Sequence, residues 1–158
     1  MKIFLPRIEI SLPQIRHNAR MLSEFYGKKG ISIMGVSKAV LGEPSIVQAM
    51  IQGGARFIAD SRIENIEKMK AAGITTQFVL LRTPLSQAES VVRSADISLN
   101  TEIETLKKLS YYAKAGNKKH QVIVMVELGD LREGVLPLDL TEFIRQAISL
   151  SHIKIVGI

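Results

Sequence analysis

A β-strand followed at once by an α-helix is predicted by residues 57–69, which read Phe57-Ile58-Ala59-Asp60-Ser61-Arg62-Ile63-Glu64-Asn65-Ile66-Glu67-Lys68-Met69. The first three residues are apolar without alternation, which is typical of a strand covered on both faces. Ser61, with Glu64 three residues later, has the spacing of a helix capping box, and apolar residues follow it at steps of three. The stretch therefore predicts one β-α unit with a buried strand and an amphipathic helix.

The same unit recurs along the whole chain. Apolar runs predict six strands, at residues 31–37, 57–59, 78–81, 97–99, 122–126 and 153–158. Between them, amphipathic segments predict helices that begin near Ser11, Pro44, Ser61, Pro84, Thr101 and Asp139. Alternating strands and helices form either a doubly wound sheet or a (β/α)8 barrel. The strands recur roughly every 20–30 residues, which favours the barrel. The glycine motifs of dinucleotide-binding and P-loop proteins are missing from the first strand-to-helix turn.

The predicted fold class is therefore α/β, a partial (β/α)8 TIM-type barrel of about six parallel strands. The sequence ends inside an apolar strand, and a parallel strand at that position would leave an unpaired edge. We interpret residues 1–158 as the N-terminal portion of one barrel domain, from a longer chain or a truncation product.

Composition limits the function classes. The 158 residues are 46% hydrophobic and 23% charged, as in ordinary globular proteins, and they include no cysteine, which excludes disulfides and thiol chemistry. Apolar runs are too short to span a membrane, and Met1–Arg7 is interrupted too soon for a signal peptide, so we expect a cytoplasmic protein. The net charge of +6 lies mostly in residues 1–40, where the basic groups are spread out. This favours a solvated surface over nucleic-acid binding.

Polar side chains follow most of the predicted strands. In a barrel, reactive groups lie where the strands end, which selects Lys38, Asp60 and Arg62, Arg82, Asn100 and the loop of residues 127–137. That loop is the longest connection between a strand and a helix, and long connections are often functional. A simpler explanation is favoured for Asp60, Ser61 and Asn100, which are expected to cap the helices that follow them.

Lys38 and Arg132 carry the sharpest chemistry. Lys38 ends the first strand, where a desolvated mouth would lower the pKa of its amine and supply a neutral nucleophile for an aldehyde. Arg132 lies among glycines, and its guanidinium suits a carboxylate or phenolate. The alternative for each of these two residues is that it is an ordinary charged residue of the protein surface. His17, His120 and His152 are isolated in the sequence, so we expect structural or surface roles for them and no metal site.

Four separated segments resemble the fold-type III family of pyridoxal-phosphate enzymes. They are Gly35-Val36-Ser37-Lys38, Asp60-Ser61-Arg62-Ile63-Glu64-Asn65, Asp96-Ile97-Ser98-Leu99-Asn100 and Leu128-Gly129-Asp130-Leu131-Arg132-Glu133-Gly134. The opening Pro6-Arg7-Ile8-Glu9-Ile10 fits as well. The resemblance covers nearly the whole chain and is closest to the ornithine racemase branch, which is related to alanine racemase. It implies the same barrel that the periodicity predicts.

The resemblance also implies a site. Lys38 would hold pyridoxal 5'-phosphate as an internal aldimine and act as one proton-transferring base, and Arg132 would contact the cofactor's phenolic oxygen and the substrate carboxylate. Arg82 and Asn100 match substrate-binding positions at the mouth. The implied activity is racemisation of a free amino acid, ornithine or a similar basic one, by a homodimer of the full-length protein.

The chain departs from alanine racemases in two ways. Ala39-Val40-Leu41-Gly42 lacks their phosphate-binding tyrosine, and the later phosphate-binding loops and the C-terminal β-domain do not occur in these residues. We therefore expect the chain alone to bind the cofactor weakly or not at all. One alternative is a non-catalytic pyridoxal-phosphate carrier, although Leu128–Gly134 favours the racemase. A D-amino-acid aldolase or dehydratase is a further alternative.

Overall fold

A single sheet of six parallel strands forms the centre of the chain, in the order β1-β2-β3-β4-β5-β6. The computed structural model describes residues 7–158, so the prediction for Met1–Arg7 and the Pro6 end of the resemblance fall almost wholly outside the described residues. The strands are β1 (Met34–Val36), β2 (Phe57–Asp60), β3 (Gln77–Leu80), β4 (Ile97–Asn100), β5 (His120–Val124) and β6 (Ile153–Gly157). Every strand pairs with its neighbour in the sequence, which confirms the predicted β-α alternation.

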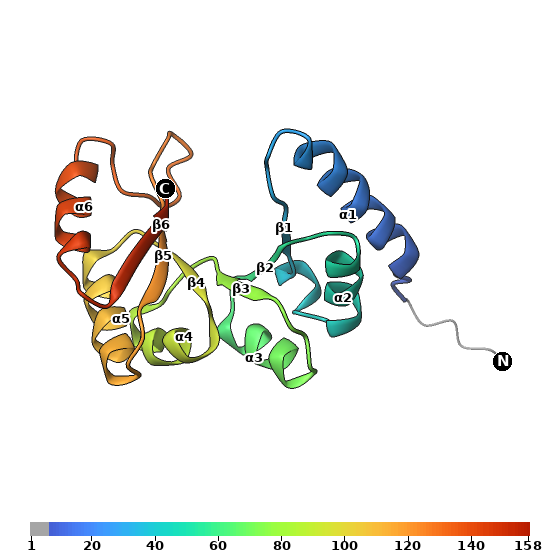
Figure 1. Ribbon diagram of the computed structural model, residues 1–158, viewed down its shortest axis with the longest axis horizontal. Helices are drawn as coiled ribbons and strands as arrows, with labels where there is room; N and C mark the ends of the chain where they lie inside the picture. Colours follow the sequence, from blue (N-terminus) through green and yellow to red (C-terminus); the bar gives the residue numbers. More distant parts are fainter. Residues whose placement is uncertain (1–6) are drawn as a thin grey trace.

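Within residues 7–158, six α-helices accompany the strands and follow one another along one side of the sheet (Figure 1). They are α1 (Leu12–Gly27), α2 (Pro44–Gln52), α3 (Ile63–Ala71), α4 (Ala88–Ser94), α5 (Ile103–Ala115) and α6 (Leu140–Ile148). Short 3-10 turns, η1 (Lys38–Val40) and η2 (Leu85–Gln87), follow β1 and β3. None of the helices within residues 7–158 has the length and apolar character needed to cross a bilayer.

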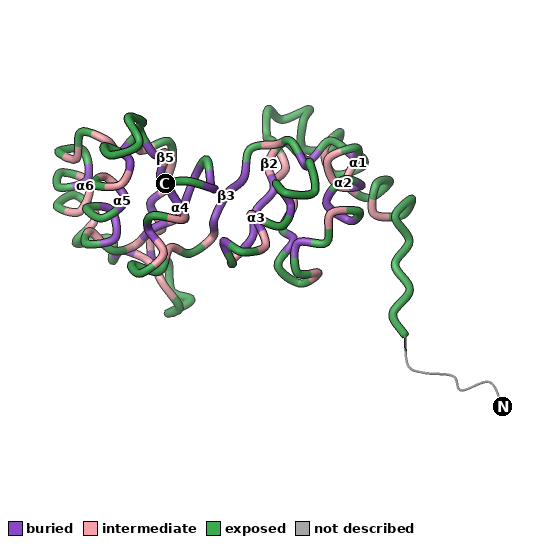
Figure 2. Tube along the Cα trace, turned by 90° about the horizontal axis from the view of Figure 1, so that it is seen from below, coloured by how far each residue is buried: buried purple, intermediate pink, exposed green. Residues whose placement is uncertain are grey.

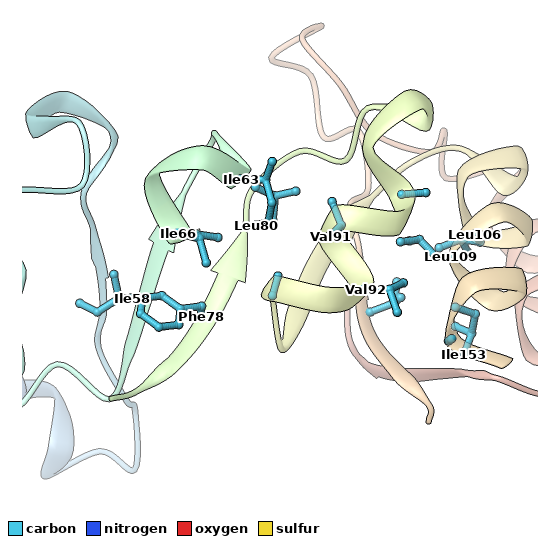
Figure 3. Close-up of a cluster of buried hydrophobic side chains, with 14 of the residues drawn as sticks. Ile58, Ile63, Ile66, Phe78, Leu80, Val91, Val92, Leu106, Leu109 and Ile153 are labelled. Atoms are coloured by element: carbon cyan, nitrogen blue, oxygen red, sulfur yellow. The ribbon is translucent and has the colours of Figure 1, made fainter. Parts of the chain in front are cut away.

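The main core lies between the sheet and these helices. Figure 3 shows Ile58, Phe78 and Leu80 of the strands beside apolar side chains of α3, with apolar side chains of α4 between these and α5. Alternate strand residues, Ala59, Val79 and Ile97, form a smaller cluster on the opposite face of the sheet. Both faces of the central strands are therefore apolar, which explains why their sequences do not alternate.

Helix α1 is the least covered element. It contains no buried residue, and Figure 2 shows it mostly exposed. Its contact with α2 is close, because a Cβ added at Gly53 would lie 2.5 Å from the Ala19 Cβ and 2.6 Å from the Arg16 carbonyl oxygen. A glycine at this position lets the two helices approach.

The predicted helix caps at Asp60, Ser61 and Asn100 are wrong. Helix α3 begins after Arg62 and α5 after Glu102, and neither has a side-chain capping bond at its first turn. Ser11 does precede α1, but its hydroxyl makes no capping bond. Asp60 instead bonds to Ser37 after β1 and to residues at the start of α3, and Asn100 bonds to Ser98 within its own strand, as described below. The predicted strand over 31–37 is also shorter, because the pairing with β2 covers only Met34–Val36.

Candidate functional site

A hollow lies at the carboxyl ends of the strands. Its volume is about 300 Å³. Its lining residues are Lys38, Ser61, Leu81, Arg82, Leu99, Met125, Arg132 and Glu133. Three of the predicted site residues, Lys38, Arg82 and Arg132, are therefore brought together from segments far apart in the sequence. The fourth, Asn100, lines an adjoining hollow instead.

Lys38 is positioned through its neighbour Ser37. The Ser37 hydroxyl donates to Asp60 Oδ2 at 2.7 Å, and the Ser37 backbone N–H donates to the Ala59 carbonyl at 2.9 Å. Ser37 and Asp60 are both fully buried. The end of β1, from which the Lys38 side chain starts, is thus fixed to the end of β2.

Asp60 joins the same network to helix α3. Its Oδ1 accepts the backbone N–H of Arg62 at 3.0 Å and the Asn65 side-chain amide at 2.9 Å. Gly42 has a φ of +61°, and a Cβ there would lie 2.9 Å from the Asn65 Cβ, so the loop after Lys38 packs directly on α3. These contacts hold both ends of the turn that carries Lys38.

The expected desolvation of Lys38 is not found. The residue is exposed at the rim of the hollow. The sheet has only six strands in this structure, so the mouth is walled by β1 to β5 and their loops and open elsewhere. The described residues therefore leave the Lys38 side chain open to solvent.

Arg132 is carried on a loop closed by backbone contacts. Residues 125–139 connect β5 to α6, and in this loop the Val135 N–H donates to the Met125 carbonyl at 2.8 Å. Gly134 is required because a Cβ would lie 2.3 Å from the Glu127 nitrogen. The Glu127 carboxylate accepts the backbone N–H groups of Gly129 and Leu131, and these bonds lower the pKa of Glu127. The segment around Arg132 is thus folded onto a carboxylate.

Glu133 belongs to the predicted loop of residues 127–137, but the sequence does not single it out as a site residue. Its Oε2 pairs with the Arg82 Nε at 2.6 Å, and the pair lies at the border of both hollows. Only its position next to Arg132 could have indicated it, because the sequence does not reveal that the loop returns to the end of β3.

Asn100 belongs to a buried hydrogen-bond network of polar side chains on the helix side of the sheet. Its Nδ2 donates to the Ser98 carbonyl and to the Ser98 Oγ, at 3.0 and 2.9 Å, and the Ser98 Oγ lies 2.8 Å from the His120 Nε2. Burial lowers the pKa of His120 to about 4, which keeps the ring neutral near pH 7. The expectation of a structural role for His120 is consistent with this position.

The charges around the first hollow suit an anionic aldehyde. Three cations, Lys38, Arg82 and Arg132, face one carboxylate, Glu133, so the lining carries a net positive charge. A primary amine can condense with an aldehyde, and guanidinium groups bind phenolate, carboxylate or phosphate. The residues present therefore fit pyridoxal phosphate.

A family comparison agrees with this geometry. The family described as alanine racemase, N-terminal domain, matches residues 10–158. The chain belongs to this family. Among its members, the ornithine racemase of Acetoanaerobium sticklandii is 42% identical over 155 residues, and the lysine racemase of Thermotoga maritima is 36% identical over 131 residues. These matches cover 97% and 82% of the chain.

The fold is also that of solved alanine racemases. The structure of alanine racemase from Streptomyces lavendulae superposes on 92% of the chain with a TM-score of 0.83, at 19% sequence identity. The chain covers 40% of that structure and 43% and 37% of the ornithine and lysine racemases. It therefore spans about two fifths of the length of the relatives that it matches, and its six strands correspond to part of their barrel.

Proposed function

We propose that the full-length protein is a pyridoxal-phosphate-dependent racemase of a free basic amino acid, ornithine or a similar one, and that residues 1–158 form the N-terminal portion of its barrel domain. One observation carries the proposal: Lys38, Arg82 and Arg132 line a single hollow at the carboxyl ends of the strands. The names of the ornithine and lysine racemases support the substrate class.

Each residue has a proposed role. The Lys38 amine would hold the cofactor aldehyde and move a proton to or from the substrate's α-carbon on its own face. The Arg132 guanidinium would orient the cofactor's phenolic oxygen and the substrate carboxylate. Arg82 and Asn100 would contact the substrate. When bound, pyridoxal phosphate supplies an electron sink for the charge left by the departing α-proton.

The remaining expectations stay predictions. The cofactor should bind weakly to the 158-residue chain, because Lys38 is exposed. The full-length protein is expected to be a cytoplasmic homodimer, and sedimentation tests its oligomeric state.

The carrier alternative is less favoured, since the match to the ornithine racemase runs through the Arg132 loop.

Borohydride reduction tests the role of Lys38. After incubation of the full-length protein with pyridoxal phosphate, reduction should attach a pyridoxyl group to Lys38, located by peptide mass spectrometry. Lys38→Arg should lose the label and at least about 10³-fold in turnover, because a guanidinium does not condense with aldehydes at neutral pH. Lys28→Arg, just beyond α1, is the matched control and should keep both. A label at another lysine would refute the assignment.

A further inference from the structure

A second hollow adjoins the first at the ends of β3 and β4. Its volume is about 220 Å³, and it shares Arg82, Leu99, Met125 and Glu133 with the first hollow. The lining unique to it is mostly polar: Thr83, Asn100, Thr101, Glu102 and Thr105, with Pro84. Since four lining residues are common, a ligand held beside Lys38 can extend into this second space.

Two residues that line the second hollow each have a buried oxygen without a partner. These oxygens are the Thr83 Oγ1 and the Asn100 Oδ1, and neither has a hydrogen-bond partner among residues 7–158. Asn100 is 4% exposed. Its amide orientation is fixed, because the atom 3.0 Å from the Ser98 carbonyl must be the donor nitrogen. The oxygen left over can only accept, so a donor is the missing partner.

Glu133 adds a charged acceptor. One of its oxygens holds Arg82, and the other has no partner in the part of the chain that the structure describes. The only cation of the lining, Arg82, is already paired with it. Glu102 lies at the N-cap of α5 and Glu104 in its first turn, and both carboxylates offset the positive partial charge of that helix end. Apart from the threonine hydroxyls, which both donate and accept, the side chains of this lining therefore offer acceptors and no unpaired cation.

We propose that the second hollow binds the distal ammonium group of a basic amino acid, with Glu133 as the specificity-determining residue. The inference rests on the proposed racemase function. An ammonium carries three N–H donors. Glu133, the Asn100 Oδ1 and the Thr83 Oγ1 are three acceptors on residues that line the second hollow. The substrate's α-amino and carboxylate groups would remain beside Lys38 and Arg132.

The test compares two substrates of the full-length protein loaded with pyridoxal phosphate. L-Norleucine has the heavy-atom length of L-ornithine but ends in a methyl group. Glu133→Gln should lower kcat/KM for ornithine by about tenfold to a hundredfold and leave norleucine within about twofold. Thr83→Val should lower only the ornithine value, by less. Glu89→Gln, on the exposed side of α4, is the matched control and should change neither.

The outcomes separate this inference from the proposed function. Equal losses for both substrates in Glu133→Gln, or no preference for ornithine in the wild type, would overturn the ammonium site while leaving the racemase intact. If no amino acid is racemised and Lys38 takes no label, the proposed function fails. Calorimetric titration of the cofactor-free protein then decides: tighter binding of ornithine than norleucine, lost in Glu133→Gln, supports the site, and equal binding overturns it.

Discussion

Asp60 illustrates how much one buried carboxylate can organise. Its two oxygens accept three donors, from Ser37 after β1, from the backbone of Arg62 and from Asn65 in α3. A capping residue would satisfy only the turn that follows it. Asp60 instead connects three successive elements beneath Lys38, so its hydrogen bonds bear directly on where the amine lies.

His120 gives a prediction at the level of one residue. Its pKa of about 4 lies below the ordinary 6.5, so the unfolded chain binds a proton that the folded chain does not. The free energy of unfolding should therefore fall by about 3 kcal/mol between pH 6.5 and pH 4 and level off below. Urea denaturation across this range measures it. His120→Gln should remove this part of the pH dependence, whereas His17→Gln, on the exposed part of α1, should keep it. An unchanged slope in His120→Gln would contradict the assignment.

Sequence reasoning predicted which residues would meet at the ends of the strands, but not the partners of these residues. Lys38, Arg82 and Arg132 were predicted because the ends of parallel strands meet at one edge. The caps failed because Asp60 binds Ser37, 23 residues away, which no local pattern reveals. Glu133 was not singled out because its position beside Arg82 depends on the path of a 15-residue loop.

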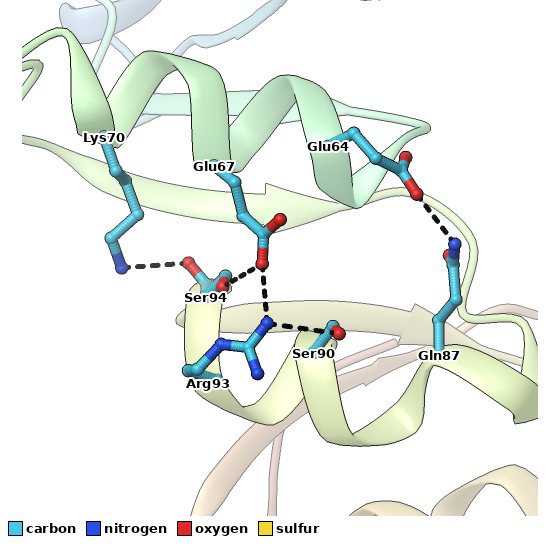
Figure 4. Close-up of polar contacts among 7 residues, drawn as sticks. All are labelled: Glu64, Glu67, Lys70, Gln87, Ser90, Arg93 and Ser94. Atoms are coloured by element: carbon cyan, nitrogen blue, oxygen red, sulfur yellow. Dashed lines mark hydrogen bonds and ion pairs between the residues drawn. The ribbon is translucent and has the colours of Figure 1, made fainter.

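At the level of elements, α3 and α4 are joined by polar contacts along their exposed sides (Figure 4). Glu67 accepts from the Arg93 guanidinium and from the Ser94 hydroxyl, both at 2.9 Å. Lys70 donates to the Ser94 carbonyl at 3.0 Å, and Gln87 donates to Glu64 at 2.9 Å. These contacts flank the apolar core and fix how the two helices lie against each other.

The Glu67 contacts predict a stability change in acid. Hydrogen bonds from Arg93 and Ser94 lower the pKa of Glu67 below its ordinary 4.5. The contribution of ionised Glu67 to the free energy of unfolding is therefore complete above pH 4.5, and it is lost as the pH falls through the lowered pKa of Glu67. Glu67→Gln should reduce the free energy of unfolding by about 0.5 kcal/mol at pH 7, because the pair is partly exposed, and by less near pH 3. Glu89→Gln should have no such effect, and a Glu67→Gln difference that grows in acid would contradict the prediction.

The six strands were predictable because their signal is local. Apolar runs and helix periodicity lie within single elements, and every strand pairs with the next one along the chain. The first and last residues of the strands were less predictable. One example is β1, which has a neighbouring strand on only one side within residues 7–158. Hydrogen bonds between Arg56 and Ile33 and between Ser37 and Ala59 extend its contact with β2 beyond the assigned strand.

At the scale of the whole molecule, the described chain leaves apolar surface open. Within residues 7–158, β1 and β6 each pair along one side only. On α1, Met21, Leu22 and Phe25 are each about half exposed. Patches of this kind are typical of interfaces.

The 158-residue chain prepared alone should therefore bind a hydrophobic dye and self-associate, as measured by fluorescence and sedimentation. Phe25→Glu should reduce dye binding and change the free energy of unfolding by less than about 0.5 kcal/mol, because Phe25 is exposed. Gln14→Glu, with the same charge change on α1, should leave dye binding unaltered. A monodisperse chain that binds no dye would contradict this prediction.

The sequential strand order bears on how the protein is made. Each strand pairs with the strand that precedes it in the sequence, so a newly made strand never has to wait for a later one before it has a pairing partner. Asp60 and its partner Ser37 both lie within the first 60 residues, so the contact beneath Lys38 needs no residue that is synthesised later. The loop that carries Arg132 and Glu133 follows β5 and is therefore synthesised after the first five strands. The hollow beside Lys38 lacks these two charged side chains until that loop has been made.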